Sequence, residues 1–226
     1  IVPSLNSLLH LWQRPHAPFS KTKPGLLLSV SEFPATDKQA APHRLTSLPG
    51  ALTEAETISP YLPTSSHIFH NEQATYTRLT ALQQNKTLQH FSLLHIVSHA
   101  FYDQFVGYTS GIALYDQDVW LDELEFLAPL PSLVTLSVCT GGHQRLFEGD
   151  EAIGLPSSCL ISGAQNVIGS LWLLPDTIGD SIMPNFYKQL FKTKQIAPAL
   201  AIAQRQAWQN GQDIRNWGSF LCTGAP

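Results

Sequence analysis

The chain has 226 residues, of which 43% are hydrophobic and 13% are charged, which is typical of one large globular domain or a compact pair with a substantial core. Its formal net charge is −4, and its Lys and Arg residues are scattered, which argues against a nucleic-acid-binding surface. No apolar run approaches the ~20 residues that cross a bilayer, so we expect neither a nucleic acid nor a membrane as a partner.

The N-terminus and the cysteine content bear on where the protein acts. Ile1-Val2-Pro3 does not begin a basic segment followed by an apolar one, as a signal peptide would, and the sequence reads as a domain excised from a longer protein. The chain has three cysteines, an odd and sparse number that argues against a disulfide framework and favours a reducing compartment. The sequence therefore predicts a cytoplasmic protein.

The first half of the chain alternates short apolar runs with helical patterns. In chain order, we expect a helix at 4–13, a strand at 26–30, a helix at 48–62 that Pro60 ends, a short strand from 67 that enters a helix at 74–84, and a strand at 91–98. Two short alternating runs follow around Asp116 and Gln117, and they predict a surface hairpin within 107–120.

The second half continues the alternation. We expect a strand at 132–138, a helix at 150–163 with Pro156 in its first turn, a strand at 164–172, a helix at 176–191 kinked by Pro184, a helix at 195–209 and a last strand at 216–224. Strands that are apolar along their whole length and alternate with helices are typical of a parallel sheet covered on both faces. The sequence thus predicts an α/β fold, with a mainly parallel sheet of about six strands between helices.

Two of the predicted strands lead directly into reactive side chains. His99 follows the strand at 91–98, and Cys139 follows the strand at 132–138. Active sites of open α/β sheets lie beyond the carboxyl ends of the strands, and neighbouring parallel strands are ~4.8 Å apart. If the two strands are neighbours, the imidazole can take the thiol proton and produce a thiolate nucleophile. The turn at Gly141 and Gly142 would leave backbone N–H groups exposed for an oxyanion.

Several ordered motifs resemble the CHAT domain, a caspase-like peptidase family found beside tetratricopeptide repeats. The matching segments are "LHIVSHA" (94–100), "TLSVCTGG" (135–142), "GDEAIGL" (149–155), "SGAQNVIGSLWLLPD" (162–176), "FYKQL" (186–190) and "WGSFLCTG" (217–224), with "VPSLNSLL" (2–9) and "LPGALTEAE" (48–56) nearer the N-terminus. The resemblance covers essentially the whole chain, and implies a single domain over residues 1–226 with a caspase-like three-layer fold that lacks the first strand or strands of the family.

The resemblance also implies a cysteine endopeptidase that needs no metal or organic cofactor. Cys139 would be the nucleophile, and His99 the general base and acid. The backbone N–H groups of Ala100 and Cys139 would hold the oxyanion. A protein or peptide would be the substrate, and a repeat domain elsewhere in the full-length chain would be the regulatory partner.

Substrate binding is implied for the end of the strand expected at 164–172. Ser170, Leu171 and Trp172 are similar to the residues that pair with the substrate backbone in caspase-like folds, by addition of a strand. Asp176 occupies a matched position; it suits the N-cap of the next helix, and its alternative role is recognition of a basic substrate residue.

Alternative interpretations start from the same residues. The family has Gly where this chain has Ala100, and many members have an acidic residue where it has Thr140, so a catalytically inactive scaffold stays open. Cys139 and Arg145 also fit Cys-x5-Arg, the phosphate-binding loop of tyrosine phosphatases. A metal site at His95 and His99 is disfavoured because the segment reads as a strand, where His95 is expected to be a hydrogen-bonded core residue. Cys159 and Cys222 are expected to be packing residues.

Overall fold

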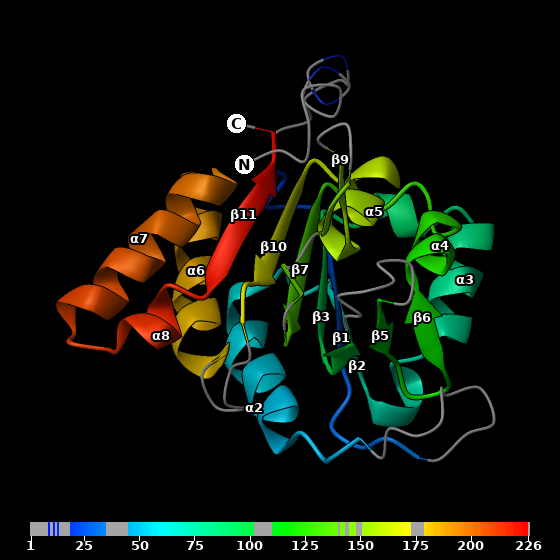
Figure 1. The fold of residues 1–226 in the computed structure, drawn as a ribbon, viewed down its shortest axis with the longest axis horizontal. Coiled ribbons are helices and arrows are strands. Elements are labelled where there is room, and N and C mark those ends of the chain that lie inside the picture. The colour runs from blue at the N-terminus through cyan, green and yellow to red at the C-terminus, as the bar shows by residue number, and fades with distance from the viewer. Residues whose placement is uncertain are drawn as a thin grey trace.

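The computed structural model describes residues 9, 11, 13, 19–34, 45–101, 110–139, 141–142, 145–147, 151–172 and 179–225. A six-stranded sheet forms the centre of the molecule, and helices cover both of its faces (Figure 1). Its strands, in spatial order, are β11 (Phe220–Gly224), β10 (Asn166–Ser170), β7 (Leu133–Val138), β3 (Leu93–Ser98), β1 (Gly25–Ser29) and β2 (His67–His70). All pairs are parallel except β10 with β11, which confirms the predicted mainly parallel sheet.

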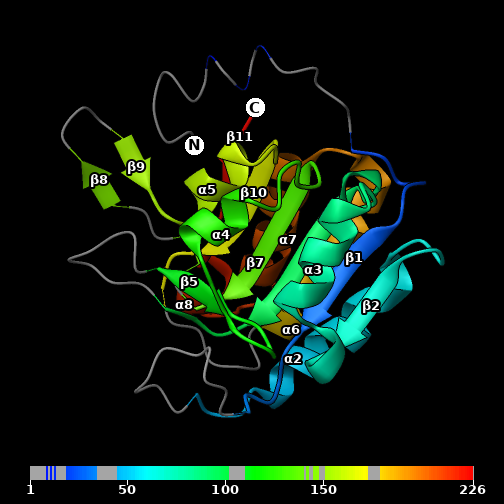
Figure 2. The same cartoon turned by 90° about the vertical axis from the view of Figure 1, so that its right-hand side faces the viewer.

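The apolar strands serve two cores, one on each face of the sheet. Side chains alternate between the faces of a strand, so Leu27 packs on one face while Leu26 and Leu28 pack on the other. The first face is covered by α2 (Pro49–Ile58), α6 (Gly179–Thr193) and α7 (Ile196–Gln209), and the second by α3 (Tyr76–Gln84), α4 (Leu121–Glu125) and α5 (Leu155–Ile161). Figure 2 shows this second group of helices in front of the strands.

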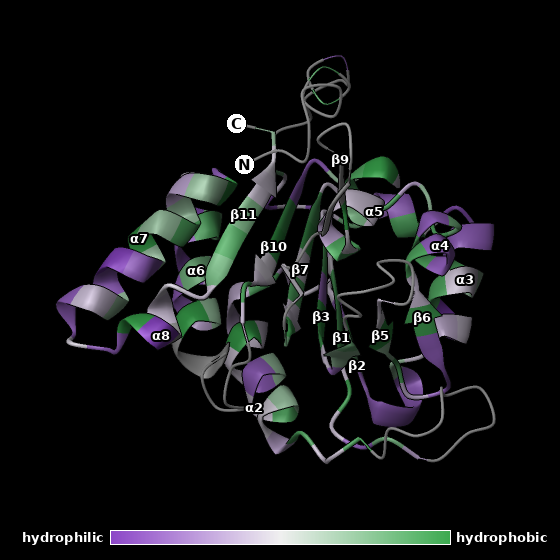
Figure 3. Ribbon diagram, viewed as in Figure 1, coloured by the Kyte–Doolittle hydropathy of each residue, from purple (hydrophilic) through white to green (hydrophobic). Residues whose placement is uncertain are grey.

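The helices that cover the sheet are amphipathic, as this layered arrangement requires. In Figure 3, α3 and α7 carry both polar and apolar residues, whereas the central strands are largely apolar. On α7, the residues facing the core are Ala199, Leu200, Ala203 and Ala207. None of the described helices is long and apolar enough to cross a membrane.

Smaller elements complete the described structure. They are the short helix α8 (Ile214–Trp217), the 3-10 turns η1 (Ser59–Tyr61), η2 (Asn71–Gln73) and η3 (Leu88–His90), a three-stranded sheet of β4 (Ala100–Phe101), β5 (Gly111–Ala113) and β6 (Asp118–Trp120), and a hairpin of β8 (Arg145–Phe147) and β9 (Glu151–Ile153). The predicted hairpin is therefore present as β5 and β6, and β4 extends it, but its strands are largely buried, so its expected position at the surface was wrong.

Some predicted boundaries were wrong. The helix expected at 150–163 begins only at Leu155, because residues 151–153 form β9 instead. The last strand, expected from 216, begins at Phe220 after the short helix α8. Pro156 does lie in the first turn of its helix, and Pro184 lies inside α6, both as predicted. Of the helix expected at 4–13, only residues 9, 11 and 13 are described, and they are helical.

A buried polar cluster links α2, α6 and the centre of the sheet. Glu54 is 2% exposed, and its Oε1 lies 2.9 Å from Nε2 of the fully buried His95. The other carboxylate oxygen, Oε2, accepts a hydrogen bond from the Ser137 hydroxyl at 3.0 Å. Nδ1 of His95 lies 2.8 Å from the Tyr187 hydroxyl, which donates to Thr135 at 3.1 Å. Burial raises the pKa of Tyr187 far above its ordinary value, so this hydroxyl stays protonated.

Replacing Glu54 is expected to destabilise the fold strongly. Glu54→Ala should lower the free energy of unfolding by about 3–5 kcal/mol, because it leaves buried polar partners without their carboxylate. Glu56→Ala, on the exposed side of the same helix, should change it by less than about 0.5 kcal/mol. Urea denaturation of the two variants measures the difference, and equal midpoints would contradict the interpretation.

Candidate active site

The strands that precede His99 and Cys139 are direct neighbours in the sheet. β3 and β7 pair in parallel, and Ser98 lies opposite Val138 in the last paired row. His99 and Cys139 are the next residues of their strands, so both follow the same row at the carboxyl edge of the sheet. Both residues are half-buried. The adjacency on which the predicted dyad depends is therefore present, and proton transfer between the two side chains stays a prediction.

A backbone carbonyl orients the His99 ring. Nε2 of His99 lies 2.8 Å from the carbonyl oxygen of Thr46, and the ring centroid lies 4.8 Å from that of Phe33. Because a carbonyl can only accept a hydrogen bond, Nε2 must carry the proton. In the neutral imidazole, Nδ1 is then the basic nitrogen. The sequence could not reveal Thr46, because every residue has a carbonyl and none of its side-chain chemistry is used.

The glycine turn after Cys139 packs closely against the end of β10. The Gly142 N–H donates to the Ser170 carbonyl at 2.7 Å, and the Gly141 N–H donates to the Val138 carbonyl at 3.1 Å. A Cβ atom at Gly142 would lie 2.9 Å from the carbonyl oxygen of Gly169, so the close approach requires glycine. The expectation that these N–H groups would be exposed for an oxyanion was therefore wrong, since both bond within the fold.

The predicted oxyanion donor at Ala100 has a suitable backbone setting. The Ala113 N–H donates to the His99 carbonyl at 2.9 Å, which makes His99 and Ala113 a hydrogen-bonded pair of an antiparallel ladder. Ala100 lies opposite Ile112 in the next row. Hydrogen-bonded and non-hydrogen-bonded rows alternate in such ladders, so the Ala100 N–H is directed away from β5. Its role, and that of the Cys139 N–H, remain predictions.

The residues predicted to bind substrate differ in exposure. Ser170 is buried, and its hydroxyl donates to the Val138 carbonyl at 2.6 Å. The Leu171 N–H donates to the Ser219 carbonyl at 2.8 Å. A substrate strand would therefore find the Leu171 N–H already bonded, and it would share the Ser170 carbonyl with Gly142.

Trp172 is the exposed member of this segment. Its side chain is 38% exposed, and its indole Nε1–H donates to the Arg215 carbonyl at 2.8 Å. A ring that is fixed at one end and exposed can form the wall of a binding site. Asp176 lies outside the described residues.

The segment after Cys139 gives the phosphatase hypothesis no support. Phosphate-binding loops of this kind use a helix N-terminus. Here Arg145 begins β8, which pairs with β9, and the next described helix, α5, begins at Leu155.

The other two thiols lie in settings that suppress their reactivity. Cys159 is buried, and burial raises the pKa of its thiol to about 12. Burial likewise raises the pKa of the Cys222 thiol, on β11, to about 11. The thiolate is the reactive form, and a thiol keeps its proton at any pH well below its pKa.

Alkylation of the folded protein should therefore be selective. Treatment with iodoacetamide at pH 8 is expected to modify Cys139 and to leave Cys159 and Cys222 unmodified until the protein is denatured. Peptide mapping by mass spectrometry measures the three positions separately, and equal modification in the folded protein would contradict the raised pKa values of the Cys159 and Cys222 thiols.

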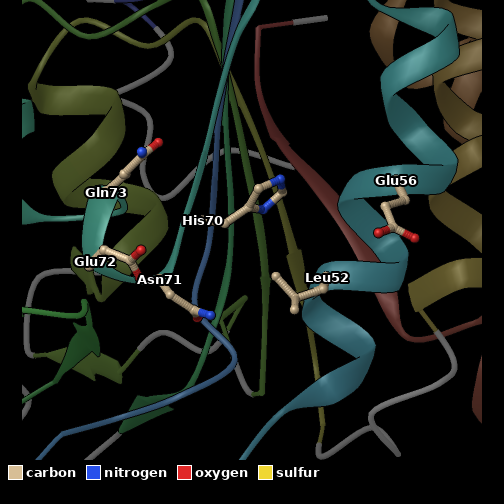
Figure 4. Close-up of a pocket in the computed structure, with 6 residues that line it drawn as sticks. All are labelled: Leu52, Glu56, His70, Asn71, Glu72 and Gln73. Carbon is tan, nitrogen blue, oxygen red and sulfur yellow. The ribbon is translucent and has the colours of Figure 1, made fainter.

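A pocket of about 340 Å³ lies between α2 and the end of β2, where Leu52 and Glu56 face His70 across the space (Figure 4). β1 separates β2 from β3 in the sheet, and His99 is not among the residues that line this pocket. Among the described residues, no group of three or more His, Cys, Asp or Glu side chains is arranged to hold a metal ion.

Comparison with known proteins identifies a matching family. The model of the CHAT domain matches residues 1–225. A search among curated proteins finds no match.

Solved structures of caspase-like cysteine proteases share the fold. Gingipain R, an Arg-specific cysteine proteinase of Porphyromonas gingivalis, has a TM-score of 0.59 at 11% identity, over 98% of this chain and 50% of that chain. Saccharomyces cerevisiae separase, in its complex with securin, has a TM-score of 0.60 at 16% identity, over 98% and 13%. Caspase-1 from Spodoptera frugiperda has a TM-score of 0.54 at 13% identity, over 93% and 91%. The chain thus spans half or less of the first two proteins, and these identities show likeness of fold alone.

Proposed function

Given that the chain belongs to the CHAT domain family and has the fold of caspase-like cysteine proteases, we propose that it is a cysteine endopeptidase that hydrolyses peptide bonds with Cys139 and His99. One observation carries the proposal: the paired row of Ser98 and Val138, directly after which both side chains follow. The Thr46 carbonyl supports it further, because it leaves the second ring nitrogen of His99 as the base.

The reaction follows from these two groups. Nδ1 of His99 takes the proton of the Cys139 thiol, and the thiolate attacks the carbonyl carbon of the scissile peptide bond. The N–H groups of Ala100 and Cys139 bind the tetrahedral oxyanion. His99 then gives its proton to the leaving nitrogen, the C–N bond breaks, and a thioester remains on Cys139. His99 next takes a proton from water, the hydroxide attacks the thioester, and the thiol is restored with release of the carboxylic acid.

The partners and the location are part of the proposal. The substrate is a protein or peptide whose backbone lies along the segment that ends at Trp172, as an added strand. A repeat domain in the full-length chain regulates the site. The protein acts in the cytoplasm, where Cys139 stays reduced.

Peptidyl acyloxymethyl ketones test the proposal on the full-length protein. A panel that differs in the residue next to the electrophile is expected to include at least one probe that labels Cys139 roughly 100-fold faster than it labels glutathione, because the dyad activates the thiol and the binding site orients the probe. Mass spectrometry identifies the labelled residue. Labelling by every probe at the rate of glutathione would refute the peptidase and support a catalytically inactive scaffold.

A further inference from the structure

One carboxylate joins the two strands that carry the dyad. Glu54, on α2, contacts His95 of β3 through Oε1 at 2.9 Å and Ser137 of β7 through Oε2 at 3.0 Å. We propose that Glu54 is a positioning residue, which fixes the strand ends that hold His99 and Cys139 relative to each other. The inference rests on the proposed function, because it assigns Glu54 a role in that reaction.

The contacts lie close to the dyad. Ser137 is two residues before Cys139, and it lies opposite Val97, which is two residues before His99. Two residues of a strand span ~6.6 Å and point to the same face. The contact of Glu54 with Ser137 is therefore made at the side chain that precedes Cys139 on the same face of β7. A shift of either strand at this row would be passed on to the residue that follows it.

Helix α2 reaches the dyad by a second route. The Thr46 carbonyl that binds Nε2 of His99 lies three residues before Pro49, where α2 begins. The connecting residue Leu48 is tied to the sheet, since its N–H donates to the Ser31 carbonyl at 2.8 Å. Because Glu54 anchors α2 to β3 and β7, it also holds the Thr46 carbonyl in place against the His99 ring.

The chemistry of Glu54 fits a positioning role better than a role in stability alone. The other buried residues of α2 are Gly50, Ala51, Ala55 and Ile58, so Glu54 is the single charged side chain among the buried residues of this helix. A buried carboxyl group and its polar partners are a poor source of stability compared with apolar packing of the same volume. Their directional contacts instead select one geometry, and here the carboxylate has a directed partner on each strand.

Ser137→Ala tests the contact between Glu54 and β7, and it leaves the contact of Glu54 with His95 in place. With the peptidyl acyloxymethyl ketone that labels the wild type fastest, the maximal labelling rate should fall about tenfold, because the reacting groups are no longer held in register. The probe concentration at half-maximal rate should stay within about twofold of the wild-type value, since the contact between Glu54 and Ser137 is not expected to touch the probe. Ser137→Thr keeps the hydroxyl and should restore the rate to within about threefold.

Ser132→Ala is the matched control. It removes a hydroxyl just before the opposite end of the same strand, where Ser132 donates to the Ser92 carbonyl at 3.3 Å. Its maximal rate should equal that of the wild type. A second variant, Glu54→Gln, keeps the size of the side chain, removes the charge, and should lower the rate about tenfold or more.

The outcomes separate the two levels of the inference. A wild type that no peptidyl probe labels faster than glutathione refutes the peptidase, and with it the positioning role. An active wild type with Ser137→Ala and Glu54→Gln at the wild-type rate overturns the positioning role alone, as does an equal loss in Ser132→Ala. The iodoacetamide rate at Cys139, measured on the same folded variants, should follow the same order, because it needs no peptide-binding site.

Discussion

Cys139→Ala is expected to abolish labelling by peptidyl acyloxymethyl ketones and to lower peptide hydrolysis by about 10⁴-fold or more. The thiolate forms the covalent intermediate, and without it only backbone donors and substrate binding remain. The fold should persist, because Cys139 is half-buried and follows the last residue of β7. Mass spectrometry of a peptide that the wild type cleaves measures the loss.

A matched control distinguishes the nucleophile from a packing thiol. Cys222→Ala removes a second half-buried thiol, on β11, and should keep the rate within about twofold of the wild type. Hydrolysis that persists in Cys139→Ala would remove the basis of the peptidase assignment.

His99→Ala is expected to lower the labelling rate at pH 7 by about 10²–10⁴-fold, because the thiol loses the base that takes its proton. The difference in labelling rate between His99→Ala and the wild type should shrink as the pH is raised, since a thiol without a neighbouring base ionises in alkaline solution. Labelling rates measured between pH 6 and pH 9 test both statements.

His90→Ala is the control for this second variant. His90 is exposed and lies in η3, before β3 begins, so its loss should leave the rate unchanged. A rate in His99→Ala equal to that of the control at every pH would show that the thiol does not depend on this imidazole.

The strands and the sheet type could be predicted from the sequence because they depend on local patterns. "LLLSV" and "SLVTLSVC" are apolar along their length, as strands buried on both faces must be. The order of the strands was not predictable in the same way. Whether β3 and β7 are neighbours depends on long-range pairing, so the adjacency of the strands that precede His99 and Cys139 could be stated only as a condition.

The parts of the site that were missed come from distant segments or from the backbone. Glu54 lies 41 residues before His95, and only the packing of α2 on the sheet brings them together. Sequence reasoning did predict that His95 is a hydrogen-bonded core residue, and this is confirmed. Gly142 was identified as a turn residue, but the pattern could not show that β10 approaches within contact distance and takes its N–H.

A crystal structure of the protein labelled at Cys139 by a peptidyl acyloxymethyl ketone tests the central claim most directly. It should show the Cys139 sulfur bonded to the probe, with His99 held by the Thr46 carbonyl and Nδ1 of its ring turned toward that sulfur. A His99 ring on the opposite side of the sheet edge from the sulfur, with the adduct formed all the same, would contradict the account.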